Sequence, residues 1–185
     1  AVDAARRLSA EGLAAVYTGP LRRTISTAQI IADEARVPDI RILHGLINVD
    51  YGVWEGMTAR DAELYDPEAF HRYRTSPSLA VCPNGERLTD AQQRMMEAIE
   101  LISQRHRGET VAAVTHAVMI RLAVAKIEHI DGEQWRIPLG RGTLTKFELG
   151  DAGIRLAAMP VASHELGTTR SHKHGTTSRP RGAVG

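Results

Sequence analysis

The chain lacks several features that would place it in a specialised class of protein. Its 185 residues include one cysteine, Cys82, so no disulfide can form within the chain and a fold held by intrachain disulfides is excluded. No apolar run approaches the roughly 20 residues needed to span a bilayer. The first residues also lack the pattern of a signal peptide. These absences predict a cytoplasmic protein that has no membrane partner.

The chain also lacks a strong net charge and a basic face. The formal net charge is +1, and the basic excess lies in the last residues. Residues 167–185 contain no acid and four basic residues, which are Arg170, Lys173, Arg179 and Arg181. Because the remainder is mildly acidic, we expect no nucleic-acid partner. Length and composition therefore predict one folded domain over residues 1–166 and a disordered basic tail over 167–185.

Hydrophobic periodicity predicts helices that alternate with short strands. The first predicted helix ends near Gly12, and four more cover Leu21–Ala35, Thr58–Tyr73, Glu86–Arg107 and Ala117–Ala125. A short helical turn is predicted over Asp131–Trp135. The predicted strands are Leu13–Tyr17, Ile40–Leu43, Val111–His116, Gly142–Leu149 and Gly153–Met159. This alternation predicts an α/β fold, a three-layer α/β/α sandwich with a mostly parallel sheet and a C-terminal hairpin.

One histidine stands at the end of the most apolar predicted strand. The run Val111-Ala112-Ala113-Val114-Thr115 ends in His116, and a helix follows directly. A strand that passes into a helix in this way places His116 at the carboxyl edge of the sheet, where open α/β sheets bind ligands. The pattern indicates a functional residue, although a histidine at a strand end can also be a satisfied part of the core.

Four short motifs follow one another on this pattern of elements. They are Thr18–Arg23 followed by Thr27-Ala28, Asn48–Gly56, Pro83–Glu86, and Val114–Ala117 with Ile120-Arg121. In this order they resemble the histidine phosphatase superfamily, in its phosphoglycerate mutase-like branch. The resemblance extends from about Ala1 to Leu166. It implies a phosphoglycerate mutase-like fold and the hydrolysis of a small phosphorylated metabolite. Mutase action is less favoured, because the segment between Trp54 and Pro83 is short for a lid that excludes water.

Two cationic or titratable residues match the family's phosphate site. Arg23 corresponds to the phosphate-binding arginine and stands at a helix start, where a guanidinium and backbone N–H groups can face an anion. His116 corresponds to the second histidine, which binds and stabilises the transferring phosphoryl group. Members of the family need no metal and no cofactor for this chemistry, so neither is expected here.

The position of the proton donor is substituted. By its register with the Gly-Val-Trp-Glu-Gly motif, Asn48 stands where the family places a Glu or Asp acid, and an amide cannot donate a proton as a general acid. Asp50 could replace it or could cap its own loop. Glu86 is a second candidate acid, or a glutamate in the first turn of a helix, where the dipole favours it.

Two aromatic residues accompany these motifs. Tyr51 and Trp54 lie in the glycine-flanked loop that follows Asn48. They could line the substrate site, or they could anchor the loop by packing against the core. The sequence leaves these alternatives open, as it does the oligomeric state.

The family's nucleophile has no match in the chain. Relatives carry Arg-His-Gly directly after their first strand, and both this strand and its motif are expected to be absent here. Arg105-His106-Arg107-Gly108 imitates the motif but precedes a strand, so we interpret His106 as a cation at a helix C-terminus. The sequence therefore predicts an N-terminally truncated phosphomonoester hydrolase that acts through a phosphohistidine intermediate. The alternative is a non-catalytic relative that binds a phosphorylated ligand or partner.

Overall fold

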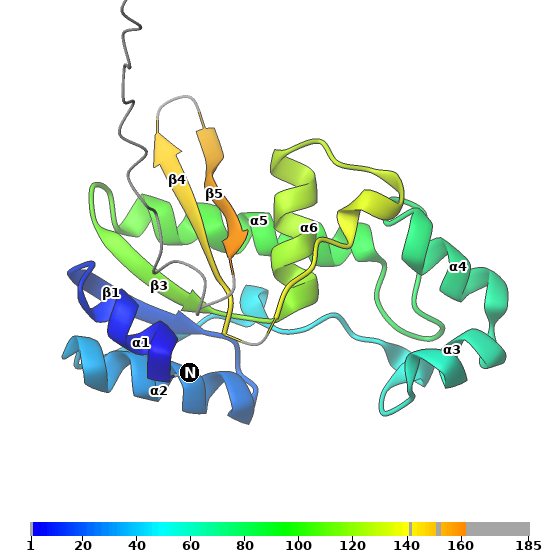
Figure 1. Cartoon of the computed structure of the whole chain (residues 1–185), viewed down its shortest axis with the longest axis horizontal. Helices are drawn as coiled ribbons and strands as arrows, with labels where there is room; N and C mark the ends of the chain where they lie inside the picture. Colours follow the sequence, from blue (N-terminus) through cyan, green and yellow to red (C-terminus); the bar gives the residue numbers. More distant parts are fainter. Residues whose placement is uncertain (1, 141, 151–152, 162–185) are drawn as a thin grey trace, which may run out of the picture.

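The computed structural model describes residues 2–140, 142–150 and 153–161 of the chain (Figure 1). The α-helices are α1 (Val2–Ser9), α2 (Arg22–Ala35), α3 (Ala59–Tyr65), α4 (Pro67–Thr75), α5 (Leu88–Arg105) and α6 (Ala117–Ile127). The strands are β1 (Leu13–Thr18), β2 (Ile40–Ile42), β3 (Thr110–Val114), β4 (Leu144–Gly150) and β5 (Gly153–Val161). Short 3₁₀ turns cover His44–Leu46 (η1), Gly52–Trp54 (η2) and Gly132–Trp135 (η3).

The first three strands form a parallel sheet in the order β2-β1-β3. The central strand, β1, is buried on both faces, as is typical of parallel sheets. Ala15 and Tyr17 belong to the core cluster that includes α5 and α6, whereas Val16 packs with residues of α1 and α2. Side chains alternate across a strand, so β1 contributes to two separate cores. The predicted three-layer sandwich is confirmed.

The C-terminal hairpin is a separate element in the described part of the chain. Strands β4 and β5 pair antiparallel with each other, as predicted, but form their own two-stranded sheet. The hairpin stands beside α6 (Figure 1) and sends Phe147 and Ile154 against the core cluster of α5 and α6. The predicted hairpin is therefore present, and side-chain packing against this core cluster joins it to the rest of the described chain.

The predicted helix over Thr58–Tyr73 is wrong as a single element. The segment forms two helices, because Asp66 ends α3 and caps α4, and Pro67 occupies the first turn of α4. Proline lacks a backbone N–H and is tolerated at a helix start but not in its interior. The side chain of Asp66 accepts from the Ala69 amide at 2.9 Å. The two short helices project to one side of the sheet (Figure 1).

Two other boundaries lie at or beyond the limits of the described residues. The predicted tail over 167–185 and the domain end at Leu166 both lie outside them. Within the described residues, no helix is both long and apolar enough to cross a membrane.

The core around α6 generates a test of the fold. Leu122 is fully buried, whereas Leu64 on α3 is 71% exposed. We expect Leu122→Ala to reduce the free energy of unfolding by about 2–5 kcal/mol, because it removes buried methyl groups and leaves a cavity. The matched substitution Leu64→Ala should change it by less than about 0.5 kcal/mol. Urea denaturation followed by circular dichroism measures both, and equal effects would contradict the packing described.

Candidate active site

The carboxyl ends of β1 and β3 place two motifs beside each other. The strands are parallel and pair Thr18 with Val114 at their last residues. The chain continues from each strand into a helix, and the Gly19 amide donates to the Val114 carbonyl at 3.2 Å. Arg23 in the first turn of α2 and His116 at the start of α6 therefore lie at one edge of the sheet. The strand pattern predicted the position of His116 at this edge, and the family resemblance implied that Arg23 shares its site.

The start of α2 is fixed so that Arg23 faces this edge. Thr24 is buried, and its hydroxyl contacts the Gly19 and Leu21 carbonyls at 3.0 and 2.8 Å. At Gly19, a β-carbon would lie 2.7 Å from the Leu46 carbonyl oxygen, so a side chain there would displace the neighbouring loop. The motif Thr18–Arg23 thus folds as a tight connection.

Arg23 and His116 are in direct contact. The Arg23 Nη2 lies 3.4 Å from the His116 Nδ1. A guanidinium can only donate, so Nδ1 is the acceptor and the proton of the neutral imidazole resides on Nε2. Nε2 is buried and has no hydrogen-bond partner among the described residues. The pair therefore offers an unused imidazole N–H and the other guanidinium donors of an exposed arginine.

The electrostatic surroundings of His116 are cationic. Burial, together with the smaller effect of the charges of Arg23 and Arg94, lowers the pKa of His116 from its ordinary value of 6.5 to about 4. The imidazole is therefore neutral at pH 7. A site with two arginines and a neutral donor favours a bound anion, since an anion offsets the repulsion between the cations.

Arg94 was not predicted from the sequence, yet it joins most of the site. Its guanidinium forms an ion pair with Glu86, with Nε to Oε1 at 2.7 Å and Nη2 to Oε2 at 3.0 Å. It also donates to three backbone carbonyls of the loop that ends at Asn48. The available signal was its position on the apolar stripe of α5, between buried Ala91 and Ala98.

Glu86 lies in the turn before α5 and is paired with Arg94. Helix α5 begins at Leu88, so Glu86 precedes the helix and the first-turn interpretation is wrong. Both of its carboxylate oxygens accept from Arg94, and Oε2 also accepts from the Asp50 amide at 3.2 Å. An ionised carboxylate that accepts at both oxygens has no proton to donate.

The other two polar candidates lie in the loop after η1. The Asn48 carbonyl accepts from Arg94 at 2.8 Å, and its side-chain Oδ1 is buried without a partner among the described residues. The Asp50 Oδ1 accepts from the Gly52 amide at 2.9 Å. Asp50 thus caps its own loop, which is the structural alternative proposed from the sequence.

The two aromatic candidates, Tyr51 and Trp54, both pack against Tyr73 of α4. Trp54 is 6% exposed and makes edge contacts with Phe70 and Tyr73. The Tyr51 hydroxyl lies 3.2 Å from that of Tyr73, and burial raises the pKa of Tyr51 above its usual range. Trp54 is therefore a packed loop anchor, and Tyr51 is the more accessible of the two.

Two glycines let the second and third motifs touch through their backbones. Gly52, at φ +55°, lies against the chain at Pro83–Gly85, and a β-carbon on Gly85 would lie 2.7 Å from the Gly52 nitrogen. The Val53 amide donates to the Pro83 carbonyl and the Glu86 amide to the Asp50 carbonyl, each at 2.9 Å. Loops 50–53 and 83–86 are consequently joined into one unit through their backbones.

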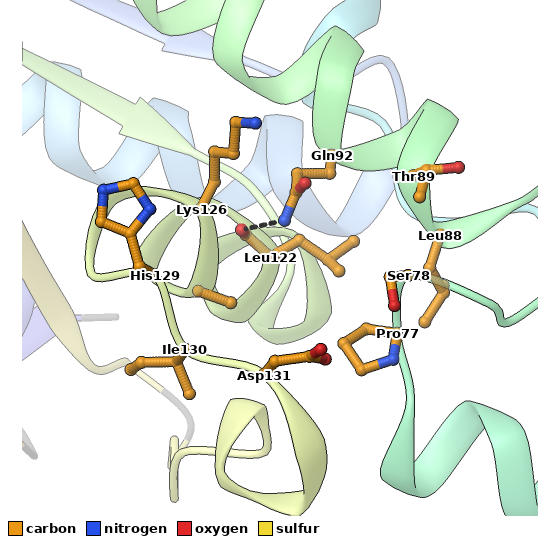
Figure 2. A pocket seen from close by; sticks show the side chains of 11 residues that line it. Pro77, Ser78, Leu88, Thr89, Gln92, Leu122, Lys126, His129, Ile130 and Asp131 are labelled. Atoms are coloured by element: carbon orange, nitrogen blue, oxygen red, sulfur yellow. Dashed lines mark hydrogen bonds between the residues drawn. The ribbon is translucent and has the colours of Figure 1, made fainter.

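A separate cavity of about 250 Å³ lies at the end of α6 remote from His116. Figure 2 shows Leu88 and Gln92 of α5 facing Leu122 of α6 across it, with Asp131 at its margin. The Gln92 amide donates to the Leu122 carbonyl at 2.9 Å. None of the predicted site residues lines this cavity, so it is not part of the anion site.

The lowered pKa of His116 can be tested directly. We expect its imidazole to titrate near pH 4 in the chain, measured by NMR of the ring carbons. Arg23→Gln should raise that midpoint, because one of the two repelling cations is removed. The unfolded chain binds the proton near pH 6.5 and the folded chain near 4, so stability should fall as the pH decreases through this window. A midpoint near 6.5 in the folded protein would contradict the described surroundings.

Comparison with known proteins agrees with this geometry. The family model of the histidine phosphatase superfamily (branch 1) matches residues 1–161. Phosphoserine phosphatase 1 of Hydrogenobacter thermophilus is 32% identical over 127 residues, and the metal-independent phosphoserine phosphatase of Arabidopsis thaliana is 31% identical over 129 residues. Each match covers 69% of this chain but only 60% and 54% of the respective relative.

A solved structure gives the same result for the fold. Bacillus stearothermophilus YhfR superimposes with a TM-score of 0.75 at 31% identity, covering 87% of this chain and 83% of that protein. The family match extends across both core clusters and both residues of the Arg23–His116 pair. On this evidence, the chain belongs to the histidine phosphatase superfamily, branch 1.

Proposed function

We propose that the chain is the phosphate-binding part of a phosphomonoester hydrolase that acts through a phosphohistidine intermediate. The observation that carries this proposal is the contact of Arg23 with His116, which leaves the His116 Nε2 proton and further Arg23 donors unused. These donors suit the equatorial oxygens of a phosphoryl group, whose charge must be stabilised during transfer. Two relatives bear the name phosphoserine phosphatase, which supports a small phosphorylated substrate.

The proposed reaction has two steps. A nucleophilic histidine attacks phosphorus, the bond from phosphorus to the ester oxygen breaks, and that oxygen leaves with the electron pair. Water then attacks the phosphorus and loses a proton, the bond from phosphorus to the histidine nitrogen breaks with its electron pair returning to that nitrogen, and inorganic phosphate leaves. Arg23 and His116 hold the phosphoryl oxygens in both steps. No described histidine stands in an Arg-His-Gly motif after a strand, so we assign the role of nucleophile to none of the described residues.

A second candidate function is phosphate binding without catalysis. It is favoured by Asn48 at the acid position and by the carboxylates of Asp50 and Glu86, which are held by Gly52 and Arg94. The coding sequence upstream of Ala1 separates the two candidates. An apolar strand that ends in Arg-His-Gly supports the hydrolase, whereas an immediate stop codon supports the binding protein.

Both candidates require anion binding at the same two residues. We expect the chain to bind inorganic phosphate, measured by calorimetry at pH 7, and Arg23→Met to weaken this binding by about 10- to 100-fold, since a charged hydrogen-bond donor is lost. Arg22→Met is the matched control, because Arg22 is the exposed preceding residue and should change affinity by less than about twofold. Equal effects of the two substitutions would exclude Arg23 as the phosphate ligand.

The amide at position 48 can be replaced by a carboxylic acid to test whether this position protonates the leaving group. Asn48→Asp should raise kcat/KM for phosphoserine, whose alkoxide leaving group needs a proton, by about 100-fold or more. It should change kcat/KM for p-nitrophenyl phosphate by less than about tenfold, because p-nitrophenolate leaves without protonation. His116→Ala should reduce turnover of both substrates. Equal gains on both substrates in Asn48→Asp would rule out a general-acid function at this position.

A further inference from the structure

The guanidinium of Arg94 uses every donor it has. An arginine side chain carries five N–H donors, and Arg94 has five oxygen acceptors. Nε contacts Glu86 at 2.7 Å, Nη1 contacts the carbonyls of Gly45 and Ile47 at 3.0 and 2.8 Å, and Nη2 contacts Asn48 and Glu86 at 2.8 and 3.0 Å. Its side chain is 22% exposed and that of Glu86 is 18% exposed. No donor remains for a ligand.

Arg23 is the opposite case at the same site. It is exposed, and its contact with His116 at 3.4 Å uses one of its terminal nitrogens. Both arginines lie near enough to His116 to lower its pKa. The site therefore holds one arginine with donors available to an anion and one whose donors are all committed to the protein.

The partners of Arg94 are the segments that shape the site. Three acceptors are carbonyls of the loop Gly45–Asn48, whose neighbouring Leu46 carbonyl also accepts from the Thr115 hydroxyl, one residue before His116, at 2.8 Å. The remaining two acceptors are the carboxylate oxygens of Glu86, and one of them, Oε2, also accepts from the Asp50 amide. Through one side chain, α5 thus holds the loop of Asn48, the loop of Asp50 and the Pro83–Glu86 turn.

We propose that Arg94 is the positioning residue of the phosphate site, which fixes the loop Gly45–Asn48 and Glu86 against His116 without contacting the substrate. The inference rests on the proposed function only in taking the ligand to be a phosphate. Lysine cannot replace Arg94, because three donors on a single nitrogen cannot reach five oxygens arranged around a planar fork.

Arg94 also acts on His116 through its charge. The charged groups that perturb this imidazole are Arg23 from α2 and Arg94 from α5, and both are cations. Keeping His116 neutral preserves the proton arrangement in which Nδ1 accepts from Arg23 and Nε2 is left to donate. Positioning and charge can be separated, because Arg94→Lys retains the charge but loses the fork.

The experiment compares two variants of the chain with the wild type. Arg94→Lys tests the fork, and the double variant Arg94→Met/Glu86→Gln removes the cation together with its carboxylate, so that no unpaired charge is left buried. The control is Arg72→Met/Glu68→Gln, an exposed ion pair on α4. Each protein is titrated with inorganic phosphate by calorimetry. The pKa of the His116 ring is then measured by NMR at a temperature below the melting temperature of that protein.

The proposal expects distinct results for the two variants. Arg94→Lys should weaken phosphate binding by about tenfold and leave the His116 midpoint near its wild-type value. The double variant should weaken binding similarly and move the midpoint from about 4 toward 6.5. The control should alter neither quantity.

Other results would overturn the proposal. If both Arg94 variants melt at lower temperature but keep wild-type phosphate affinity and the wild-type His116 midpoint, Arg94 stabilises the fold only. If the wild type binds no phosphate, the proposed function fails, but the midpoint in the double variant still decides whether Arg94 acts on His116.

Discussion

The parallel pairing of β1 with β3 is the constraint on which the site depends. It aligns Thr18 with Val114, so that two chain segments far apart in the sequence turn into helices at the same edge. Because β1 is buried on both faces, between the α1–α2 and α5–α6 layers, this edge cannot shift relative to the core. A slip of one residue would exchange the two faces of the strand and move Arg23 away from His116.

Around this edge, the protein uses positive charge in two ways. Arg23 is presented to solvent from the first turn of α2, whereas Arg94 is partly buried, forms an ion pair with Glu86 and donates to backbone carbonyls. The outer arginine can exchange water for a ligand, and the inner one supplies a permanent field and a rigid support. A phosphate group entering such a site meets preorganised donors, and little reorganisation is needed when charge develops on its oxygens.

Much of this arrangement could be predicted from the sequence. The apolar runs before Thr18 and His116 indicate strands that end at a ligand edge, and the motif order indicates the family. The break at Asp66-Pro67 was missed because the polar periodicity on both sides is helical, although the proline signals a new helix start. Arg94 was missed for a different reason: its place on an apolar stripe indicates that it packs near the core, but its five acceptors come from loops whose path only the folded chain determines.

The backbone contact between Gly52 and Gly85 has a consequence for how members of such a family could diverge. Where two loops touch main chain to main chain, neither has a side chain at the contact that could be varied, and an insertion in one displaces the other. The side chains that remain free to vary lie around this junction, at Tyr51 and on α3 and α4, and on α3 both Leu64 and Tyr65 are exposed. The backbone contact between the two loops is thus constrained in sequence, whereas side chains of α3 and α4 can be substituted without disturbing it.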